Sequence, residues 1–172
     1  MPTSNPQHLS WLCEQILEHR PKSILDIGVG FGSKGMLFRE YSDIWDRNLK
    51  DWKTRIDGVE IFEDYLTDIH KQIYTNIYIG NILNLIDSLP GYDFIYMGDV
   101  IEHIEKDKAL ALIEKLKHKG KIVVIVTPED IGKQGTVFGN ANEAHISQWY
   151  TEDFKDFQAF KINMMIVAKY EK

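Results

Sequence analysis

Short apolar segments typical of β-strands alternate with segments of helical spacing along most of the chain. The expected strands are residues 23–27, 55–59, 76–79, 92–97 and 121–127, and the expected helices between them are 33–41, 62–71 and 106–118. This alternation predicts parallel strands joined by right-handed crossovers, with helices on both faces of one sheet. The sequence therefore predicts a Rossmann-like, doubly wound α/β fold, in which ligands bind at the carboxyl ends of the strands.

The ends of the chain extend this pattern. Residues 8–19 place Leu9, Leu12 and Ile16 on one face at helical spacing, so we expect an opening helix. Residues 162–170 form a last apolar strand, which we expect to pair antiparallel at the edge of the sheet. Residues 129–149 have no clear periodicity, and this long segment is a candidate lid over a ligand.

Length and composition limit the class of protein. With 172 residues the chain has room for one domain, expected to span residues 1–172. No apolar run approaches the roughly 20 residues that span a bilayer. The first residues lack the pattern of a secretory signal and Cys13 is the single cysteine, so we expect a cytoplasmic protein. The net charge is −6 and most Lys and Arg residues are scattered, so nucleic-acid binding is not expected.

A glycine-rich turn follows the first expected strand. Gly28, Gly30 and Gly32 let the chain turn sharply and let backbone N–H groups approach a ligand at the start of a helix. Ser33 stands where a dinucleotide-binding loop has its third glycine, and no Gly-Lys-Ser/Thr sequence for a nucleoside triphosphate is present. Asp26 lies in the apolar strand before the turn. Its carboxylate is costly to bury unless loop amides or a cationic ligand group, such as the α-ammonium of a methionine moiety, bind it.

Polar residues also follow the next two strands. Glu60 comes directly after residues 55–59 and can accept hydrogen bonds from both ribose hydroxyls of a nucleotide, with Ile61 packed on the adenine. Asn81 comes after residues 76–79 and is a candidate partner for the adenine edge. A solvated carboxylate at the start of a helix is the plainer interpretation of Glu60 alone, but the glycine turn favours the ligand role.

With these residues considered together, the chain resembles the class I methyltransferases that use S-adenosyl-L-methionine (SAM). Residues 24–32 are similar to the family's first motif, Glu60 to its acidic second motif and residues 80–82 to its third. Residues 92–104 look like the fourth motif in the Asp-x-x-Glu-His form common in small-molecule methyltransferases. The resemblance implies SAM as the methyl donor. The residues that we expect at the cofactor are Asp26, Gly28, Gly30, Gly32, Glu60, Ile61, Asn81, Ile82, Asp99 and Val100.

The sequence departs from the family pattern in two places. The stretch between Asp26 and Glu60 is longer than usual, and the excess, residues 42–54, carries Trp45, Arg47 and Trp52. It is interpreted either as a rim of the substrate site or as added surface structure anchored by the tryptophans. The family usually closes with a β-hairpin, but residues 158–172 offer one good strand, so we expect a shortened or missing edge strand.

Methyl transfer from a sulfonium is an in-line displacement, so the protein chiefly aligns the two partners and excludes water. Where the acceptor is a hydroxyl, a base with a pKa near neutral helps, and histidine is the natural choice. His145, after the fifth strand, and His103, beside the expected cofactor, are the candidate catalytic residues. The alternatives are that His145 pins the loop to the sheet and that His103 packs against the cofactor.

No metal site is expected from the sequence. Asp99, Glu129 and Asp130 follow strand ends, but acidic residues are common there and no paired Asp-Asn completes a set of oxygen ligands. The acceptor is expected to be a small molecule, because the negative net charge does not suit phosphate contacts and the Asn/Asp-Pro-Pro-Tyr/Phe sequence of base methylases is absent.

Several alternatives stay open at this point. A protein acceptor and a homo-oligomer are both compatible with the sequence. The chain could also be a non-catalytic SAM-binding module with a methyltransferase fold. A nicotinamide-dependent oxidoreductase is disfavoured by Asp26 and by the missing third glycine.

Overall fold

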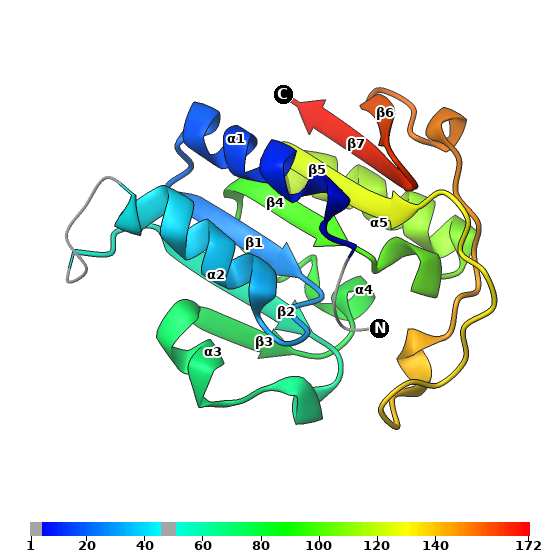
Figure 1. Ribbon diagram of the computed structural model, residues 1–172, viewed down its shortest axis with the longest axis horizontal. Helices are drawn as coiled ribbons and strands as arrows, with labels where there is room; N and C mark the ends of the chain where they lie inside the picture. Colours follow the sequence, from blue (N-terminus) through cyan, green and yellow to red (C-terminus); the bar gives the residue numbers. More distant parts are fainter. Residues whose placement is uncertain (1–4, 46–50) are drawn as a thin grey trace.

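The computed structural model describes residues 5–45 and 51–172 and places seven strands in one sheet (Figure 1). The strands are β1 (Ser23–Ile27), β2 (Arg55–Glu60), β3 (Asn76–Ile79), β4 (Tyr92–Gly98), β5 (Gly120–Pro128), β6 (Gln158–Ile162) and β7 (Met165–Glu171). Their order across the sheet is β3-β2-β1-β4-β5-β7-β6. β1 to β5 are parallel, and β7 is antiparallel to both of its neighbours. The predicted α/β fold with a mostly parallel sheet is confirmed.

Helices cover both faces of the sheet because its central strands are apolar on both sides. α1 (Leu9–His19), α2 (Ser33–Arg39) and α3 (Asp68–Ile73) pack on one face, and α4 (Ile82–Leu85) and α5 (Lys106–Lys119) pack on the other. In β1, Ile24 joins the core under α1 and α2, whereas Leu25 and Ile27 join the core under α5. Successive side chains of a strand point to opposite faces, so one short apolar strand serves both cores. No helix in the described residues has the length and apolar character needed to cross a membrane.

The helix predicted at residues 62–71 is two separate elements. A 3₁₀ turn occupies Glu63–Tyr65, and α3 begins only at Asp68. Thr67 separates them, because its backbone is extended and its N–H donates to Nδ1 of His70 at 2.9 Å, which closes a capping box at the start of α3. The sequence does not predict α4, because four residues are too few to show helical periodicity.

The last two strands form a complete hairpin, so the expectation of a shortened or missing edge strand is wrong. A two-residue turn, 163–164, joins β6 to β7, and Asn163 adopts a φ of 51°, a left-handed conformation that asparagine tolerates. Because the turn is so tight, the last residues of the chain suffice for two strands. β7, the expected edge strand, lies inside the sheet, and β6 forms the edge.

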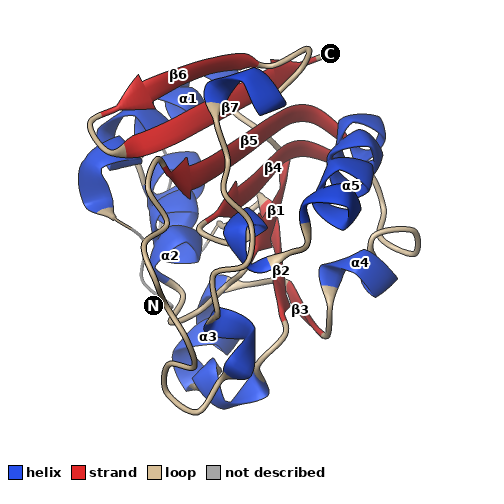
Figure 2. Cartoon of the chain, turned by 90° about the vertical axis from the view of Figure 1, so that its right-hand side faces the viewer, coloured by secondary structure: helices blue, strands red, loops and turns tan. Residues whose placement is uncertain are grey.

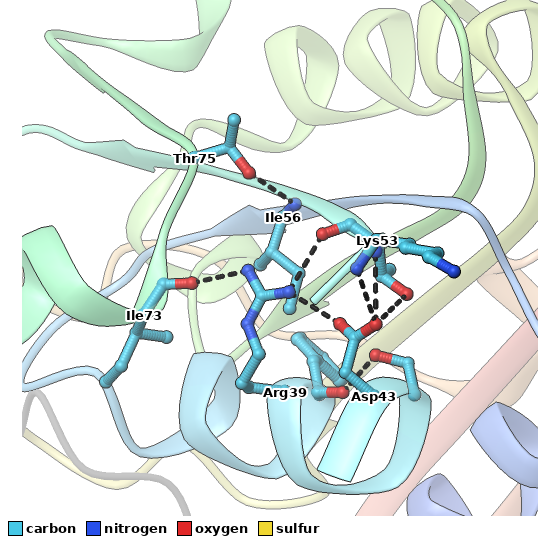
Figure 3. Close-up of polar contacts among 9 residues, drawn as sticks. Arg39, Asp43, Lys53, Ile56, Ile73 and Thr75 are labelled. Atoms are coloured by element: carbon cyan, nitrogen blue, oxygen red, sulfur yellow. Dashed lines mark hydrogen bonds and ion pairs between the residues drawn. The ribbon is translucent and has the colours of Figure 1, made fainter. Parts of the chain in front are cut away.

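The longer stretch before β2 is held by a buried ion pair (Figure 3). α2 continues into a π-helical turn, Glu40–Ile44, in which Asp43 accepts a hydrogen bond from Arg39 at 2.6 Å. Backbone N–H groups of Lys53 and Thr54 donate to the same carboxylate at 2.9 and 3.2 Å. Burial alone would raise the pKa of Asp43, but these hydrogen bonds and the Arg39 charge lower it.

This stretch lies at the end of the sheet opposite to the expected ligand site. Arg55 begins β2 level with the first residue of β1, so the residues before it lie at the amino ends of the parallel strands. Trp45 stacks on Tyr41, and Trp52 lies under the Arg39 guanidinium. Residues 42–45 and 51–54 are therefore added structure and not a rim of the substrate site, while Arg47 lies outside the described residues.

We expect Asp43→Asn to lower the free energy of unfolding by about 3 kcal/mol, because a buried guanidinium then loses its counter-charge. The matched control is Asp68→Asn, which breaks an exposed ion pair with Lys71 and should leave stability nearly unchanged. Urea unfolding of the two variants measures the difference. Equal midpoints would show that the Arg39–Asp43 pair does not anchor this stretch.

Candidate functional site

A cleft lies at the carboxyl ends of β1, β2, β3 and β4, the end of the sheet that faces the viewer in Figure 2. The predicted site residues that line it are Gly28, Gly30, Glu60, Ile61, Asn81, Ile82, Asp99, Val100 and His103. Asp26, Gly32 and His145 are not among the lining residues.

The glycine turn brings the end of β1 against the turn after β4. Gly28 has a φ of 83°, and a Cβ there would lie 2.3 Å from Cγ2 of Val100, so only glycine fits. The N–H of Gly28 donates to the carbonyl of Val59 at 2.9 Å, which ties the turn to the end of β2 as well. Three neighbouring strand ends thereby form one continuous floor of the cleft.

Glu60 both braces the glycine turn and lines the cleft. Its Oε2 accepts the N–H of Gly30 at 2.8 Å, and its Oε1 accepts the N–H of Phe62 at 2.9 Å. Burial raises the pKa of the carboxyl, although these backbone hydrogen bonds act in the opposite direction. Each carboxylate oxygen can accept more than one hydrogen bond, so both can still bind a ligand hydroxyl. The solvated carboxylate that the sequence allowed is excluded.

Asp26 lies beneath the cleft and not on its wall. It is fully buried, and its Oδ2 accepts a hydrogen bond from the Tyr74 hydroxyl at 2.6 Å. Its Oδ1 has no hydrogen-bond partner among the described residues. Burial raises the pKa of Asp26 to about 7, and the Tyr74 hydroxyl and the Lys34 charge act against that rise. A buried carboxylate with one unused oxygen is suited to a cationic partner.

Lys34 is a candidate binding residue that the sequence analysis misses. It stands in the first turn of α2 and lines the cleft, yet only 6% of its surface is exposed. No described residue forms a hydrogen bond or ion pair with its ammonium group, and burial lowers its pKa while the charges of Asp26 and Asp99 raise it. A buried ammonium on a cleft wall is suited to an anionic ligand group. The sequence did offer one sign that Lys34 is buried. It stands four residues before the buried Phe38, and residues four apart lie on the same face of a helix.

Asp99 and Val100 form a sharp turn after β4. Asp99 has a φ of 52°, which is strained for a residue with a side chain, and its N–H donates to the carbonyl of Val126 at 2.9 Å. Strained residues of this kind concentrate at functional sites.

Asn81 caps the start of α4, on the other side of β1 in the sheet order. Its Oδ1 accepts the N–H of Leu83 at 2.9 Å. The amide NH₂ of Asn81 is therefore the part of the side chain left for a ligand.

The turn after β4 also brings the two candidate catalytic histidines together. The rings of His103 and His145 have centroids 5.0 Å apart. Nδ1 of His103 donates to the carbonyl of Ala144 at 3.1 Å, and Nδ1 of His145 donates to the carbonyl of Ile131. Burial lowers the pKa of His103. Both rings are therefore pinned to the backbone by one nitrogen, as the structural alternative for His145 requires, and each keeps its other nitrogen for chemistry.

Glu102 lies beside the two rings and is almost completely buried. Its Oε2 accepts a hydrogen bond from the Thr127 hydroxyl at 3.1 Å. Burial and the nearby Asp99 carboxylate raise its pKa well above the ordinary value. One ligand atom from each of Glu102, His103 and His145 lies within 4.8 Å of the others. The sequence places Glu102 in the fourth motif, residues 92–104, but gives no sign of this grouping.

The segment after β5 runs across the carboxyl ends of the strands (Figure 2). On one side, the N–H groups of Ile146 and Ser147 donate to the carbonyl of Glu102 at 2.9 and 3.0 Å. On the other side, the Tyr65 hydroxyl donates to Oε1 of Glu143 at 3.0 Å. Tyr65 and Glu143 both line the cleft. The segment is therefore fastened on two sides of the cleft, in the position that the sequence predicts for a lid.

Solved structures match the chain over almost its whole length, although no protein-family model and no curated protein matches it. The N-terminal domain of EvdMO1, crystallised with S-adenosylhomocysteine (SAH) and D-fucose, is 12% identical with a TM-score of 0.66, covering 98% of this chain and 83% of that one. The methyltransferase domain of bacterial CtHen1 is 17% identical with a TM-score of 0.65, covering 98% and 99%.

A third match is magnesium protoporphyrin IX methyltransferase (ChlM) from Synechocystis PCC 6803 with bound SAH. It is 14% identical with a TM-score of 0.66, covering 95% of this chain and 81% of that one. SAH is the product that SAM leaves after it has donated its methyl group. These likenesses, together with the strand order, show that the chain has the fold of SAM-dependent methyltransferases.

Proposed function

We propose that the chain is an enzyme, a SAM-dependent methyltransferase that acts on a small-molecule acceptor. The observation that carries the proposal is the set of groups around one cleft: the glycine turn after β1, Glu60 after β2, Asn81 after β3 and Asp99 after β4. Structures of the same fold that contain SAH support the same cofactor. The cytoplasmic location and the single-domain extent stay predictions from the sequence.

The nucleoside end of SAM fits the groups after β2 and β3. Glu60 has acceptor capacity for the two ribose hydroxyls beyond its two backbone hydrogen bonds. Ile61 and Ile82 offer apolar surface for the adenine, and the amide NH₂ of Asn81 offers a donor for its edge. The cofactor-binding roles proposed for Gly28 and Gly30 are supported by the positive φ of both residues, which glycine adopts without strain and which lets the backbone approach a ligand closely.

The methionine end of SAM carries one negative and one positive charge, and the structure offers a partner for each. Lys34 would hold the carboxylate, because its ammonium has no other partner among the described residues. Asp26, with an unused buried oxygen, would attract the α-ammonium from beneath the glycine turn. The two partners are charge neighbours, so the site is complementary to a zwitterion.

Bound SAM supplies a methyl group on a sulfonium, which needs only a well-aligned acceptor and a dry site. The turn after β4 and the segment after β5 enclose the cleft and limit the entry of water. His103 and His145 would act on the acceptor, because each ring keeps one nitrogen that no described residue occupies. Loss of a proton from the acceptor, helped by this pair, prepares it for methylation.

The acceptor is proposed to be a small molecule because the segment after β5 is hydrogen-bonded on both sides of the cleft. A segment held across the cleft in this way leaves little room for a macromolecule. Two exposed aromatic rings, Phe31 and Phe138, have centroids 6.0 Å apart, and Phe31 also contacts the buried Tyr65, which lines the cleft, at 5.2 Å. They offer an apolar surface for part of the acceptor.

We predict that the purified chain binds SAH with one site per chain and that Lys34→Met weakens this binding by about tenfold, the loss expected for one charge-assisted hydrogen bond. The same variant should bind 5′-methylthioadenosine as the wild type does, because this ligand lacks the amino-acid end. Lys108→Met, at an exposed lysine on α5, is the control. Isothermal calorimetry measures the affinity for both ligands. An equal loss of affinity for SAH and for 5′-methylthioadenosine would show that Lys34 does not bind the carboxylate of SAH.

Binding of SAH should weaken as the pH falls below about 7, the pKa of Asp26. Affinity for SAH falls with pH because the ligand's ammonium binds the ionised carboxylate, whereas the buried carboxyl group is protonated and neutral at low pH. Calorimetry between pH 5.5 and 7.5 should show affinity rising with pH in the wild type and staying flat in Asp26→Asn. A wild-type profile as flat as that of the variant would show that Asp26 does not meet the ammonium.

His145→Ala should lower turnover at saturating acceptor by about 100-fold, the lower end of what loss of acid–base help costs. The assay is SAH release with panels of small phenols, alcohols, carboxylates and amines, which also identifies the class of acceptor. Affinity for SAH should be unchanged, since His145 is not among the residues proposed to hold the cofactor. Turnover equal to that of the wild type would leave His145 with a structural role alone.

A further inference from the structure

We propose that Glu102, His103 and His145 bind a divalent transition-metal ion beside the cleft. The inference rests on the proposed function for its catalytic role: with Nε2 of both rings on the ion, the ion and not an imidazole nitrogen would lower the pKa of the acceptor. It replaces the expectation of no metal site, which considered Asp99, Glu129 and Asp130. The fold brings together a different set, a carboxylate and two imidazoles from two distant parts of the chain.

The position of the three side chains is fixed by the backbone. Glu102 and His103 belong to a 3₁₀ turn after β4, Ile101–His103, and His145 belongs to the segment after β5. The carbonyl of Glu102 accepts the N–H groups of Ile146 and Ser147, the two residues after His145. These hydrogen bonds place His145 against the side chains of Glu102 and His103.

The hydrogen bonds of the two rings fix which nitrogen is available. A carbonyl can only accept, so Nδ1 of both rings must carry the proton, and Nε2 of each neutral ring has a free lone pair. Neither Nε2 has a hydrogen-bond partner among the described residues. Histidines that bind metals almost always donate their other nitrogen in this way, to a backbone carbonyl or a carboxylate.

The third ligand, the Glu102 carboxylate, is buried without a cationic side chain bound to it in the described part of the chain. Glu102 is 1% exposed, and within the described residues its carboxylate accepts hydrogen bonds from uncharged groups, the Thr127 hydroxyl and its own backbone N–H. No lysine or arginine in the described part of the chain pairs with it, and the Asp99 carboxylate adds negative charge nearby. A buried carboxylate is retained where a cation or metal compensates it.

The donor set selects the kind of ion. Two imidazoles and one carboxylate suit Zn²⁺, Mn²⁺ or Fe²⁺, whereas Mg²⁺ and Ca²⁺ prefer oxygen ligands. Bonds of about 2.1 Å to such an ion separate tetrahedral ligands by about 3.4 Å. The three ligand atoms, which lie within 4.8 Å of one another, would have to approach one another by up to about 1.4 Å on binding.

An ion held by three protein ligands keeps coordination positions for other groups. His103 lines the cleft, so an acceptor in the cleft can reach these positions. A hydroxyl coordinated to a divalent cation has a lower pKa, which favours an oxygen acceptor at neutral pH.

The test is titration of the metal-free chain with Zn²⁺ and Mn²⁺ by calorimetry, without SAM or acceptor. We expect one ion per chain, with affinity at least tenfold weaker in His145→Gln, His103→Gln and Glu102→Gln. His118→Gln, at an exposed histidine on α5, is the matched control and should bind as the wild type does. Mg²⁺ should bind much more weakly.

A second readout needs no variant. Mn²⁺ is paramagnetic, so bound at this site it should broaden the imidazole resonances of His103 and His145 selectively and leave those of His118 sharp. The proposal is overturned by the lack of a stoichiometric site, by equal binding in His145→Gln, or by broadening that spares both rings. Binding of SAH is measured separately, so a chain that binds SAH but no metal refutes this inference and leaves the proposed function intact.

Discussion

The carboxylate of Glu60 is the contact on which the geometry of the cleft depends. It accepts one N–H from the glycine turn after β1 and another from the loop after β2, at 2.8 and 2.9 Å. Buried hydrogen bonds to a charged group are strong, so these two loops are held in one arrangement before any ligand arrives. In the proposed complex the same carboxylate faces the ribose, and the group that shapes the cleft is also the group that binds the cofactor.

Buried charges divide into two kinds in this protein. Arg39 and Asp43, at the amino ends of the strands, satisfy each other and nearby backbone groups, and they hold the added stretch before β2. Lys34 and Glu102 lie at the carboxyl ends and have no ion-pair partner within the described residues. Burial of a charged group outside an ion pair costs stability, and such groups concentrate at binding and catalytic sites. This contrast supports the proposed site at the carboxyl ends of the strands, whereas the ion pair at the amino ends serves the structure.

The fold and most of the cleft could be predicted because the determinants are local. Ile24, Leu25 and Ile27 show a strand buried on both faces, and Gly28, Glu60, Asn81 and Asp99 each follow a strand directly. Parallel strands bring such residues to one edge. The closing hairpin was missed because one left-handed residue, Asn163, makes the turn. The grouping of Glu102, His103 and His145 was missed because hydrogen bonds in an aperiodic segment create it.

The central claim is that this cleft binds SAM through the residues at its strand ends. A crystal structure of the chain grown with SAH tests it most directly. The account predicts the ribose hydroxyls within hydrogen-bond distance of Glu60 and the amino-acid end over the glycine turn, next to Lys34. An empty cleft, or SAH bound at another surface, would contradict the account and leave only the fold.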